Sequence, residues 1–429
     1  MKTVKSILIL AILLINGFAF SQSGWYSVIP PESGLSINFI RFPSENTGYA
    51  IGCYLPYNAS ALLKTTNAGQ NWEKTVFDTI RFENIFFIDN NTGFTTGFHS
   101  QNKYIYKTTN GGKVWNQCSC AAVPEFSYFF MIKFCDYNTG FITTRNGGLL
   151  KTTNGGLYWD FKSGFVWHEP RSLECLDSNT WIVMDEYTSI FKTTNCGNNW
   201  FTIDLSNIGF NSTSMFFINS TTGYSTNYTG KIFKTTNSGE NWLKICNNIP
   251  LNVDGNITFT NENTGFVCGD GANGCVFKTT NGGYNWIPSL VNPLAFCYSV
   301  NFINNYTGYA GGRNGNIFKT TNGGSVFIHN ISGEVPEKFS LSQNYPNPFN
   351  QSTIFNLQCS RLGGSSTGLV KVIVYDASGR EVQTLVNETL APGTYQVRFD
   401  GSGLASGLYY YSMSIDGKQT AVKKMVMVK

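Results

Sequence analysis

The chain has 429 residues and a formal net charge of +4, and charged residues make up only 13% of it while aromatic residues make up 15%. No basic stripe is visible, because seven of the lysines recur at regular intervals along the chain. These features argue against a nucleic-acid-binding protein, and the length allows two or three domains with a large buried core.

The first residues predict export. Lys2 and Lys5 precede an apolar run from Ile7 to Phe20, and small residues suited to cleavage follow near Ser21. The run is short for a bilayer-spanning helix, so residues 1–21 are predicted to be a signal peptide, with a membrane anchor as the alternative. No other apolar stretch of the sequence approaches the length of a spanning helix.

Two motifs then recur in phase through residues 22–330. The first is typified by FKTTNGGYNW at residues 277–286, and the second by FINNYTGY at residues 302–309, where a TG turn follows a landmark phenylalanine. The lysine of the first motif falls at Lys64, Lys107, Lys151, Lys192, Lys234, Lys278 and Lys319. The second motif begins at Phe42, Phe87, Phe134, Cys175, Phe217, Phe259 and Phe302. Successive lysines are 41 to 44 residues apart, which indicates one supersecondary unit repeated seven times.

Each unit is predicted to contain four short β-strands. Segments rich in Phe, Tyr, Ile and Val are separated by Thr-Gly and Asn-Gly turns, and no helical period is visible. Four strands in each of seven units predict an all-β fold, a seven-bladed β-propeller, whose ring closure protects the sheet edges. The strand that begins at Trp25 is predicted to close the ring as the outer strand of the last blade, although residues 325–330 could take that place instead. Two units depart from the pattern, with Trp181 in place of glycine and Phe327 in place of tryptophan.

The turn Thr-x-Asn-x-Gly-x-x-Trp resembles the Asp-box of bacterial neuraminidase repeats, with asparagine in place of the usual aspartate. The threonine hydroxyl and the asparagine carbonyl oxygen are suited to accept backbone N–H bonds inside the turn, and the tryptophan is suited to cover the hairpin. Because asparagine lacks the charge, we predict a structural role for Asn67, Asn110, Asn154, Asn195, Asn237, Asn281 and Asn322. Residues 22–330 also resemble the propeller family that includes the photosystem II assembly factors.

A ligand is predicted to bind on one face of the ring. The TG turns and Asp-boxes are expected on the opposite face, so the loops between second and third strands and the crossovers between blades form a variable face. The candidate residues on it are Arg145, Arg313, Asp185, Glu186, Trp167, His168, Glu169 and Arg171. This aromatic and charged mixture suits contact with a sugar or a peptide, and ordinary solvated loops are the alternative.

The eleven cysteines allow disulfides in an oxidising compartment. Cys268 and Cys275 are the favoured pair, because they are predicted to face each other across the second hairpin of one blade. Cys135 and Cys175 are interpreted instead as small buried apolar residues. The cysteines and the three histidines lack the spacing of metal ligands, and no cofactor motif is present, so neither a metal nor a cofactor is predicted.

The repeats end in a predicted linker, residues 331–340, and strands of period two then predict a small immunoglobulin-like β-sandwich over residues 341–429. This segment closely resembles the type A C-terminal sorting domain of the Bacteroidota type IX secretion system. The residues that carry the resemblance include Tyr345, Pro346, Asn347, Pro348, Phe349, Gly379, Arg380, Gly407 and Tyr409. The resemblance implies passage through the periplasm, recognition by the type IX machinery at the outer membrane, and then attachment to the cell surface or release.

Two functions of different class follow. The first is a non-catalytic propeller on the cell surface or outside the cell that binds a protein or a glycan. The alternative is a secreted, sialidase-like glycoside hydrolase, for which the Asp-box resemblance implies three converging arginines, a Tyr–Glu nucleophile pair and an aspartic acid. The propeller offers only Arg41, Arg81, Arg145, Arg171 and Arg313, and this constellation is not recognisable. A photosystem role is the least favoured, because the sorting domain implies a different cell envelope.

Overall fold

The structure is a computed structural model and describes residues 24–29, 32–54, 59–78, 80–99, 102–124, 128–145, 147–163, 169–186, 189–252, 255–271, 275–290, 296–324, 328–332, 334–361, 368–390, 392–401 and 404–429. It divides into two compact units, one formed chiefly by residues 27–319 and the other chiefly by residues 320–429. Within these ranges no helix has the length and apolar character needed to span a bilayer.

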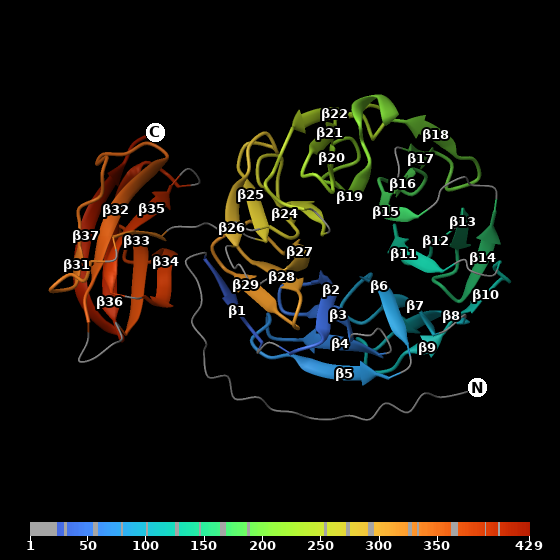
Figure 1. The fold of residues 1–429 in the computed structure, drawn as a ribbon, viewed down its shortest axis with the longest axis horizontal. Helices are drawn as coiled ribbons and strands as arrows, with labels where there is room; N and C mark the ends of the chain where they lie inside the picture. Colours follow the sequence, from blue (N-terminus) through green and yellow to red (C-terminus); the bar gives the residue numbers. More distant parts are fainter. Residues whose placement is uncertain are drawn as a thin grey trace. The chain divides into compact units, whose positions relative to one another are not determined.

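The first unit is a propeller in which the described residues form seven sheets, one for each sequence repeat, arranged around a ring (Figure 1). Blade 1 consists of β2 (Leu35–Arg41), β3 (Gly48–Tyr54), β4 (Ala59–Thr65) and β5 (Glu73–Phe77), and blade 2 of β6 (Arg81–Phe87), β7 (Gly93–His99), β8 (Asn102–Thr108) and β9 (Asn116–Gln117). Blade 3 consists of β11 (Phe129–Phe134), β12 (Gly140–Thr144), β13 (Gly148–Thr152) and β14 (Tyr158–Lys162), with β10 (Ser119–Cys120) parallel to β14. Blade 4 consists of β15 (Pro170–Cys175), β16 (Trp181–Asp185), β17 (Ser189–Thr193) and β18 (Phe201–Asp204).

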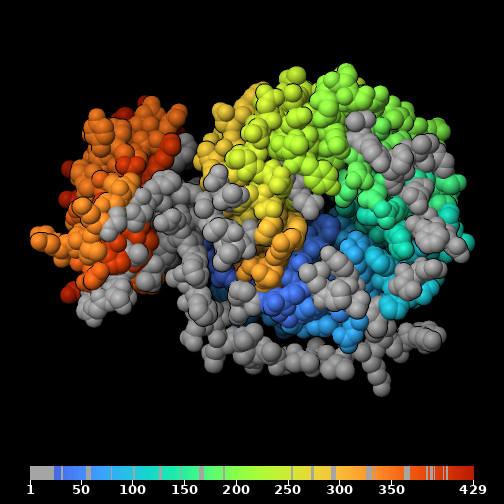
Figure 2. Space-filling view, viewed as in Figure 1, coloured from blue at the N-terminus to red at the C-terminus, as the bar shows by residue number. Residues whose placement is uncertain are grey.

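Blades 5 to 7 consist of β19 (Ser212–Phe217), β20 (Gly223–Asn227), β21 (Ile232–Thr235) and β22 (Leu243–Cys246); β23 (Ile257–Phe259), β24 (Gly265–Cys268), β25 (Val276–Thr279) and β26 (Ile287–Leu290); and β27 (Cys297–Phe302), β28 (Gly308–Gly312), β29 (Ile317–Thr320) and β1 (Trp25–Ser27). A short 3₁₀ helix, η1 (Ser206–Ile208), precedes blade 5. In the space-filling view the blades follow one another in sequence colour around the ring (Figure 2).

The ring closes with the N-terminal strand. β1 lies beside β29 in the last sheet, and Val28 donates its N–H to the carbonyl of Ile317 at 2.9 Å. The prediction that the Trp25 strand completes the last blade is therefore confirmed. β30 (Ile328–Ser332), which includes residues considered for the same place, pairs instead with β35 (Gly393–Asp400) in the C-terminal unit.

Neighbouring blades stack through the landmark phenylalanine. Its ring lies against the aromatic residue that follows the TG turn of the preceding blade, as in Tyr49–Phe87, with centroids 3.6 Å apart, and Phe94–Phe134, with centroids 4.4 Å apart. Phe42 stacks on Tyr309 at 3.9 Å in the same way. The contact that joins the last blade to the first is thus the contact repeated around the ring.

In blade 4 the landmark phenylalanine and the glycine of the TG turn are both replaced. Elsewhere the glycine of the TG turn lies against the landmark ring of its own blade, and a Cβ on Gly48 would stand only 2.4 Å from the Phe42 ring. In blade 4 the landmark is Cys175, and the space holds the fully buried ring of Trp181, whose centroid lies 4.4 Å from that of Phe141 in blade 3. The tryptophan is tolerated because the phenylalanine ring is missing, and it supplies the aromatic contact that would otherwise be lost.

The repeat lysines also join the blades. Lys64, Lys107 and Lys151 each donate to a carbonyl in the Asp-box of the next blade at 2.6 to 2.7 Å. Lys319 donates to the carbonyl of Ala68 in the first blade at 2.6 Å, which repeats the bond across the closure. These lysines are therefore structural rather than a surface for an acidic ligand.

Each Asp-box is held by the bonds that its residue types predict. In the box of Asn154, the Thr152 hydroxyl donates to the asparagine Oδ1 at 2.9 Å and accepts the N–H of Gly156 at 2.9 Å, and the asparagine Oδ1 accepts the N–H of Tyr158 at 3.1 Å. The threonine–asparagine and threonine–glycine bonds recur in all seven boxes. The asparagines thus act as hydrogen-bond acceptors inside a turn.

The second unit is a β-sandwich of two four-stranded sheets in the described residues. One sheet runs in the order β30, β35 (Gly393–Asp400), β32 (Ser352–Cys359), β31 (Ser340–Leu341), and the other in the order β34 (Glu381–Thr389), β33 (Leu369–Asp376), β36 (Gly407–Ile415), β37 (Lys418–Met427). Their inner faces pack into one apolar core that includes Leu357, Val372 and Met413. β30 belongs to this sandwich although its residues straddle the predicted end of the propeller and the start of the linker.

Most of the sorting-domain motif stabilises this sandwich. Phe349 is 1% exposed in the core, Asn347 Oδ1 accepts the N–H of Val426 at 2.9 Å, and the Tyr409 hydroxyl donates to the carbonyl of Ala405 at 2.8 Å. Arg380 bonds Asp376 across the turn that Gly379 opens with a φ of 83°. Tyr345 exchanges two backbone hydrogen bonds with Ile354, and its side chain is 78% exposed.

Candidate functional site

The two ends of each propeller blade are built differently. In six blades a backbone N–H of the Asp-box donates to a carbonyl of the TG turn, as Gly155 does to Asn138 at 2.9 Å, so these turns lie together on what we call the turn face. The loops between second and third strands lie at the other strand ends, where Arg145 N–H donates to Tyr128 and Arg313 N–H donates to Phe296 in the preceding crossovers. This second end is the variable face predicted from the sequence.

Four predicted residues form one ion-pair network on the variable face, which we call the arginine–glutamate ladder: Arg145, Glu169, Arg171 and Glu186. Arg145 Nη2 pairs with Glu169 Oε1. The second carboxylate oxygen of Glu169, Oε2, lies 3.5 Å from Arg171 Nη2. Arg171 Nη2 also donates to Glu186 Oε1 at 3.0 Å. The ladder joins the loop of blade 3, the following crossover and the loop of blade 4, and its side chains are between 20% and 45% exposed.

Arg171 is the centre of the ladder. Its guanidinium carbon lies 5.9 Å from the centroid of the Tyr228 ring in blade 5, within cation–π range, so the network reaches a third blade. Burial by itself lowers the pKa of Arg171, but Tyr228, the hydrogen bond to Glu186 and the charge of Glu169 outweigh it and raise the pKa above its usual value. Its Nε is buried without a hydrogen-bond partner in the described residues. Arg171 is therefore a fixed positive charge, with one donor left unused among the described residues.

The other predicted residues do not join this network in the same way. Arg313 Nε donates to the Tyr298 hydroxyl at 2.9 Å, and its guanidinium carbon lies 3.9 Å from the Phe296 ring centroid within blade 7. Asp185 is 3% exposed and accepts the N–H of Ser189 at 3.3 Å, so its side chain stabilises a hairpin instead of facing a ligand. Trp167 and His168 lie outside the described residues.

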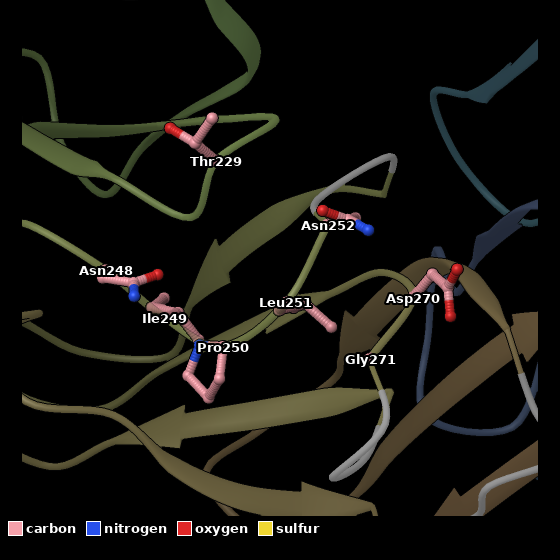
Figure 3. A pocket seen from close by; sticks show the side chains of 8 residues that line it. All are labelled: Thr229, Asn248, Ile249, Pro250, Leu251, Asn252, Asp270 and Gly271. Atoms are coloured by element: carbon pink, nitrogen blue, oxygen red, sulfur yellow. The ribbon is translucent and has the colours of Figure 1, made fainter.

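A pocket of about 370 Å³ lies between blades 5 and 6 (Figure 3). Its lining residues are Thr229, Asn248, Ile249, Pro250, Leu251, Asn252, Asp270 and Gly271. Asn252 and Asp270 exchange two backbone hydrogen bonds of 2.7 and 2.9 Å, which fix the crossover against the loop of blade 6. The lining combines one carboxylate and two amide side chains with the aliphatic side chains of Ile249 and Leu251, a set suited to a polar or cationic group on an aliphatic stem.

Tyr228 and Asp270 are not among the residues predicted from the sequence, although a signal for them exists. One position lies five residues after the first residue of each second strand. In blades 3 to 7 it is occupied by Arg145, Glu186, Tyr228, Asp270 and Arg313. One position of the repeat therefore supplies a residue to the variable face in each of these five blades. Because Thr229 follows Tyr228 directly, the same loop contributes to both the ladder and the pocket.

A further missed residue is Glu83 on β6. Burial raises the pKa of its carboxyl group, although Arg81, whose Nε lies 2.8 Å from Glu83 Oε1, lowers it. The Arg81 guanidinium carbon lies 5.5 Å from the ring centroid of Phe98, the residue of blade 2 at the repeat position described above. A carboxyl group with a raised pKa beside an arginine is a feature of some catalytic sites.

The cysteines differ from their predicted roles. Cys135 and Cys175, interpreted as buried apolar residues, form a disulfide between blades 3 and 4, with Cα atoms 5.8 Å apart. Cys268 and Cys275, the favoured pair, are not disulfide-bonded in the structure. The register explains this, because Cys268 stands opposite Val276 and Cys275 is one residue out of register with it. The described residues contain no group of three or more His, Cys, Asp or Glu side chains arranged to hold a metal ion.

Comparisons with known families agree with both resemblances. Residues 343–429 match the model of the secretion system C-terminal sorting domain. Residues 79–200 and 117–250 match the model of the photosynthesis system II assembly factor YCF48. The chain is thus a β-propeller followed by a sorting domain, which marks it for export by type IX secretion to the cell surface or the extracellular space.

Solved structures share the fold at low sequence identity. A structure of YCF48 bound to a D1 peptide has a TM-score of 0.55 and 19% identity, and the match covers 72% of this chain and 100% of that one. PorZ of Porphyromonas gingivalis, described as an essential surface component of the type IX secretion system, has a TM-score of 0.55 and 13% identity, with 92% of this chain and 59% of PorZ covered. The GH74 enzyme of Niastella koreensis has a TM-score of 0.50 and 15% identity, with coverages of 92% and 73%. No curated protein sequence is significantly similar to the chain.

Proposed function

We propose that this chain, a β-propeller exported through a type IX sorting domain, is a non-catalytic recognition module that binds a polypeptide segment through its variable face. The arginine–glutamate ladder carries the proposal. It brings side chains of blades 3 and 4 into one partly exposed network that extends to Tyr228 of blade 5. Arginine and tyrosine are the residues that dominate binding energy at protein interfaces.

A polypeptide fits this surface better than a neutral glycan. Acidic groups of a partner would meet Arg145 and Arg171, and a lysine or arginine side chain would fit the pocket at Asp270, because that pocket combines a carboxylate with an apolar base. The solved propeller YCF48 binds a peptide, which shows that a protein of this fold is able to do so.

The glycoside hydrolase is the second candidate, favoured by one observation. The raised pKa of Glu83 is the property expected of a general acid. Against it, Glu83 is paired with Arg81, and Glu169 and Glu186 are both engaged by Arg171. The similarity to the GH74 enzyme concerns the fold only.

The test is binding to a peptide array by the mature chain, residues 22–429, with Arg171→Met as the main variant. We expect at least a tenfold loss of affinity, which corresponds to about 1.4 kcal/mol, and a weaker wild-type signal at high salt. Lys113→Met is the matched control, because it removes one positive charge from the Asp-box of blade 2 on the turn face. Thermal melting checks that both variants are folded.

Two results would redirect the proposal. Loss of binding in Tyr137→Ala but not in Arg171→Met would place the ligand on the turn face, where Tyr137 is 62% exposed. Turnover of fluorogenic glycosides by the wild type, abolished in Glu83→Gln, would instead identify a hydrolase.

Export is tested separately in a bacterium that has type IX secretion. We expect deletion of residues 341–429 to leave the propeller in the periplasm, because the machinery at the outer membrane recognises the sorting domain. Cell fractionation and surface labelling measure the outcome. Unchanged surface display of the truncated protein would contradict the role of this domain in sorting.

A further inference from the structure

Three buried cysteines meet where blade 6 packs against blade 7. Cys268 ends β24, Cys275 directly precedes β25 and Cys297 begins β27, and the side chains of all three are inaccessible to solvent. The sulfur atoms of Cys275 and Cys297 lie 2.9 Å apart. Two sulfur atoms that are not covalently bonded rarely approach so closely in a packed interior.

The backbone fixes this arrangement on both sides. Gly269 donates its N–H to the carbonyl of Cys275 at 3.0 Å, and Cys297 donates its N–H to the carbonyl of Gly269 at 3.3 Å. The same glycine therefore holds the two cysteines, one from each blade. Cys275 approaches Cys297 because of blade packing, whereas its own hairpin places Val276, not Cys275, opposite Cys268.

We propose that Cys275 and Cys297 form a disulfide in the exported protein, which joins blade 6 covalently to blade 7. Two S–H bonds break and one S–S bond forms, and the two protons and two electrons pass to the disulfide of a thiol–disulfide oxidoreductase, which leaves as a dithiol. The sorting domain takes the chain through compartments in which such oxidants operate.

The environment indicates when the bond forms. Burial raises the pKa of Cys297 well above its usual value, and its neighbours Cys275 and Cys268 raise it further. The thiolate is the form that attacks a disulfide, so the closed fold disfavours the reaction and gives no path to an oxidant. The bond is therefore expected to form before blade 7 packs against blade 6 and buries the two sulfur atoms.

The bond would be the second covalent link between adjacent blades. The Cys135–Cys175 disulfide joins blades 3 and 4 across 40 residues, and Cys275 and Cys297 would join blades 6 and 7 across 22 residues. The new bond would lie in the part of the ring that meets the closing strand. It would keep the last two blades together when the closing strand frays.

Peptide mapping of the exported wild-type chain tests the proposal without any variant. The protein is denatured with iodoacetamide and no reductant, digested, and analysed by tandem mass spectrometry. We expect a linked peptide pair containing Cys275 and Cys297, which disappears on reduction, and a singly alkylated Cys268. Alkylation of all three cysteines, or a dominant link that includes Cys268, would overturn the proposal.

Variants provide an independent measurement. Without reductant, Cys275→Ala, Cys297→Ala and the double variant are expected to share one lowered Tm, at least about 3 °C below that of the wild type, because each removes the same bond. Cys268→Ala should retain the linked peptide. Additive losses of Tm in the double variant would show two separate packing effects and no shared bond.

Discussion

The turn face and the variable face of the propeller are built from different kinds of contact. On the turn face one set of bonds recurs around the ring, with a threonine, an asparagine and a glycine in every Asp-box. On the variable face one repeat position holds arginine, glutamate, tyrosine or aspartate in blades 3 to 7. The repeated bonds stabilise the fold. Residues at positions that take no part in those bonds can vary and are able to determine which ligand binds.

The comparison also separates two ways of tolerating change. Where aromatic rings stack between blades, a change at one repeat position needs a second change that compensates for it. In blade 4, Trp181 replaces glycine and Cys175 replaces the landmark phenylalanine. On the variable face, Arg313 and Arg145 occupy the same repeat position with entirely different partners. The following predictions test how far this difference extends, beginning with the largest effect.

The largest effect is expected from Trp181→Gly, which restores the common glycine but leaves a cavity where no phenylalanine ring is present. We expect a loss of at least about 3 kcal/mol in the free energy of unfolding, measured by denaturant titration. Cys175→Phe alone should also destabilise the protein, because its ring would meet Trp181. The double variant should be more stable than the sum of the two losses predicts, a coupling that a double-mutant cycle measures.

Cys175→Ala is the control for this cycle, because Cys175→Phe also removes the disulfide to Cys135. The loss of stability in Cys175→Ala is subtracted from the loss in Cys175→Phe. If the corrected loss and the loss in Trp181→Gly simply add in the double variant, Trp181 does not take the place of the missing phenylalanine ring.

A smaller effect is expected from Asn154→Ala in the Asp-box of blade 3. It removes the acceptor of the Thr152 hydroxyl and of the Tyr158 N–H, and should cost about 1 kcal/mol of stability. Peptide binding should not change, because the box lies on the turn face. Reduced affinity in this variant at a temperature where it is fully folded would break the separation between the two faces.

The smallest effect concerns the pH dependence of stability. It distinguishes the TG turns that contain an aspartate from those that contain an asparagine. In blades 2 and 4, Asp89 and Asp177 accept two backbone N–H bonds each, at 2.6 to 2.8 Å, where blades 5 and 6 use Asn219 and Asn261. Burial, the largest single cause, raises the pKa of both aspartates, but the hydrogen bonds together outweigh it and lower the pKa. Their contribution to stability is therefore present above the unfolded-state pKa and lost as the pH falls through the lower folded-state pKa.

We expect the variant with both Asp89→Asn and Asp177→Asn to lose less Tm than the wild type between pH 5 and about pH 2. Asp160→Asn, on the exposed side of β14, is the control. Parallel Tm curves for all three proteins would show that these turns contribute nothing to the pH dependence.

Much of the fold follows from local patterns. The period of the Asp-box predicts seven units, the TG and NGG turns predict four strands in each, and Trp25 predicts the closing strand, all of which agree with the sheets of the structure. The sorting domain is equally visible, because its turn residues occur at fixed places and the family model matches them. Such features are predictable because each depends on residues a few positions apart.

The candidate site was only partly predictable. The sequence places Arg145, Glu169, Arg171 and Glu186 on one face, but it does not show that Glu169 pairs with both arginines or that Tyr228 lies beside Arg171. It placed Asp185 among the ligand contacts, whereas that carboxylate is buried in a hairpin. Exposure and pairing depend on how two blades face each other, which a repeat pattern does not specify.

The sequence by itself determined the number of repeated units, their turn chemistry and the sorting domain that marks the chain for export, because each of these properties depends on local residue patterns. The tertiary structure decided which cysteines meet, which ring fills blade 4 and which charges form the ladder. Those contacts join separate sheets, and their energies depend on side chains brought together only after the ring has closed.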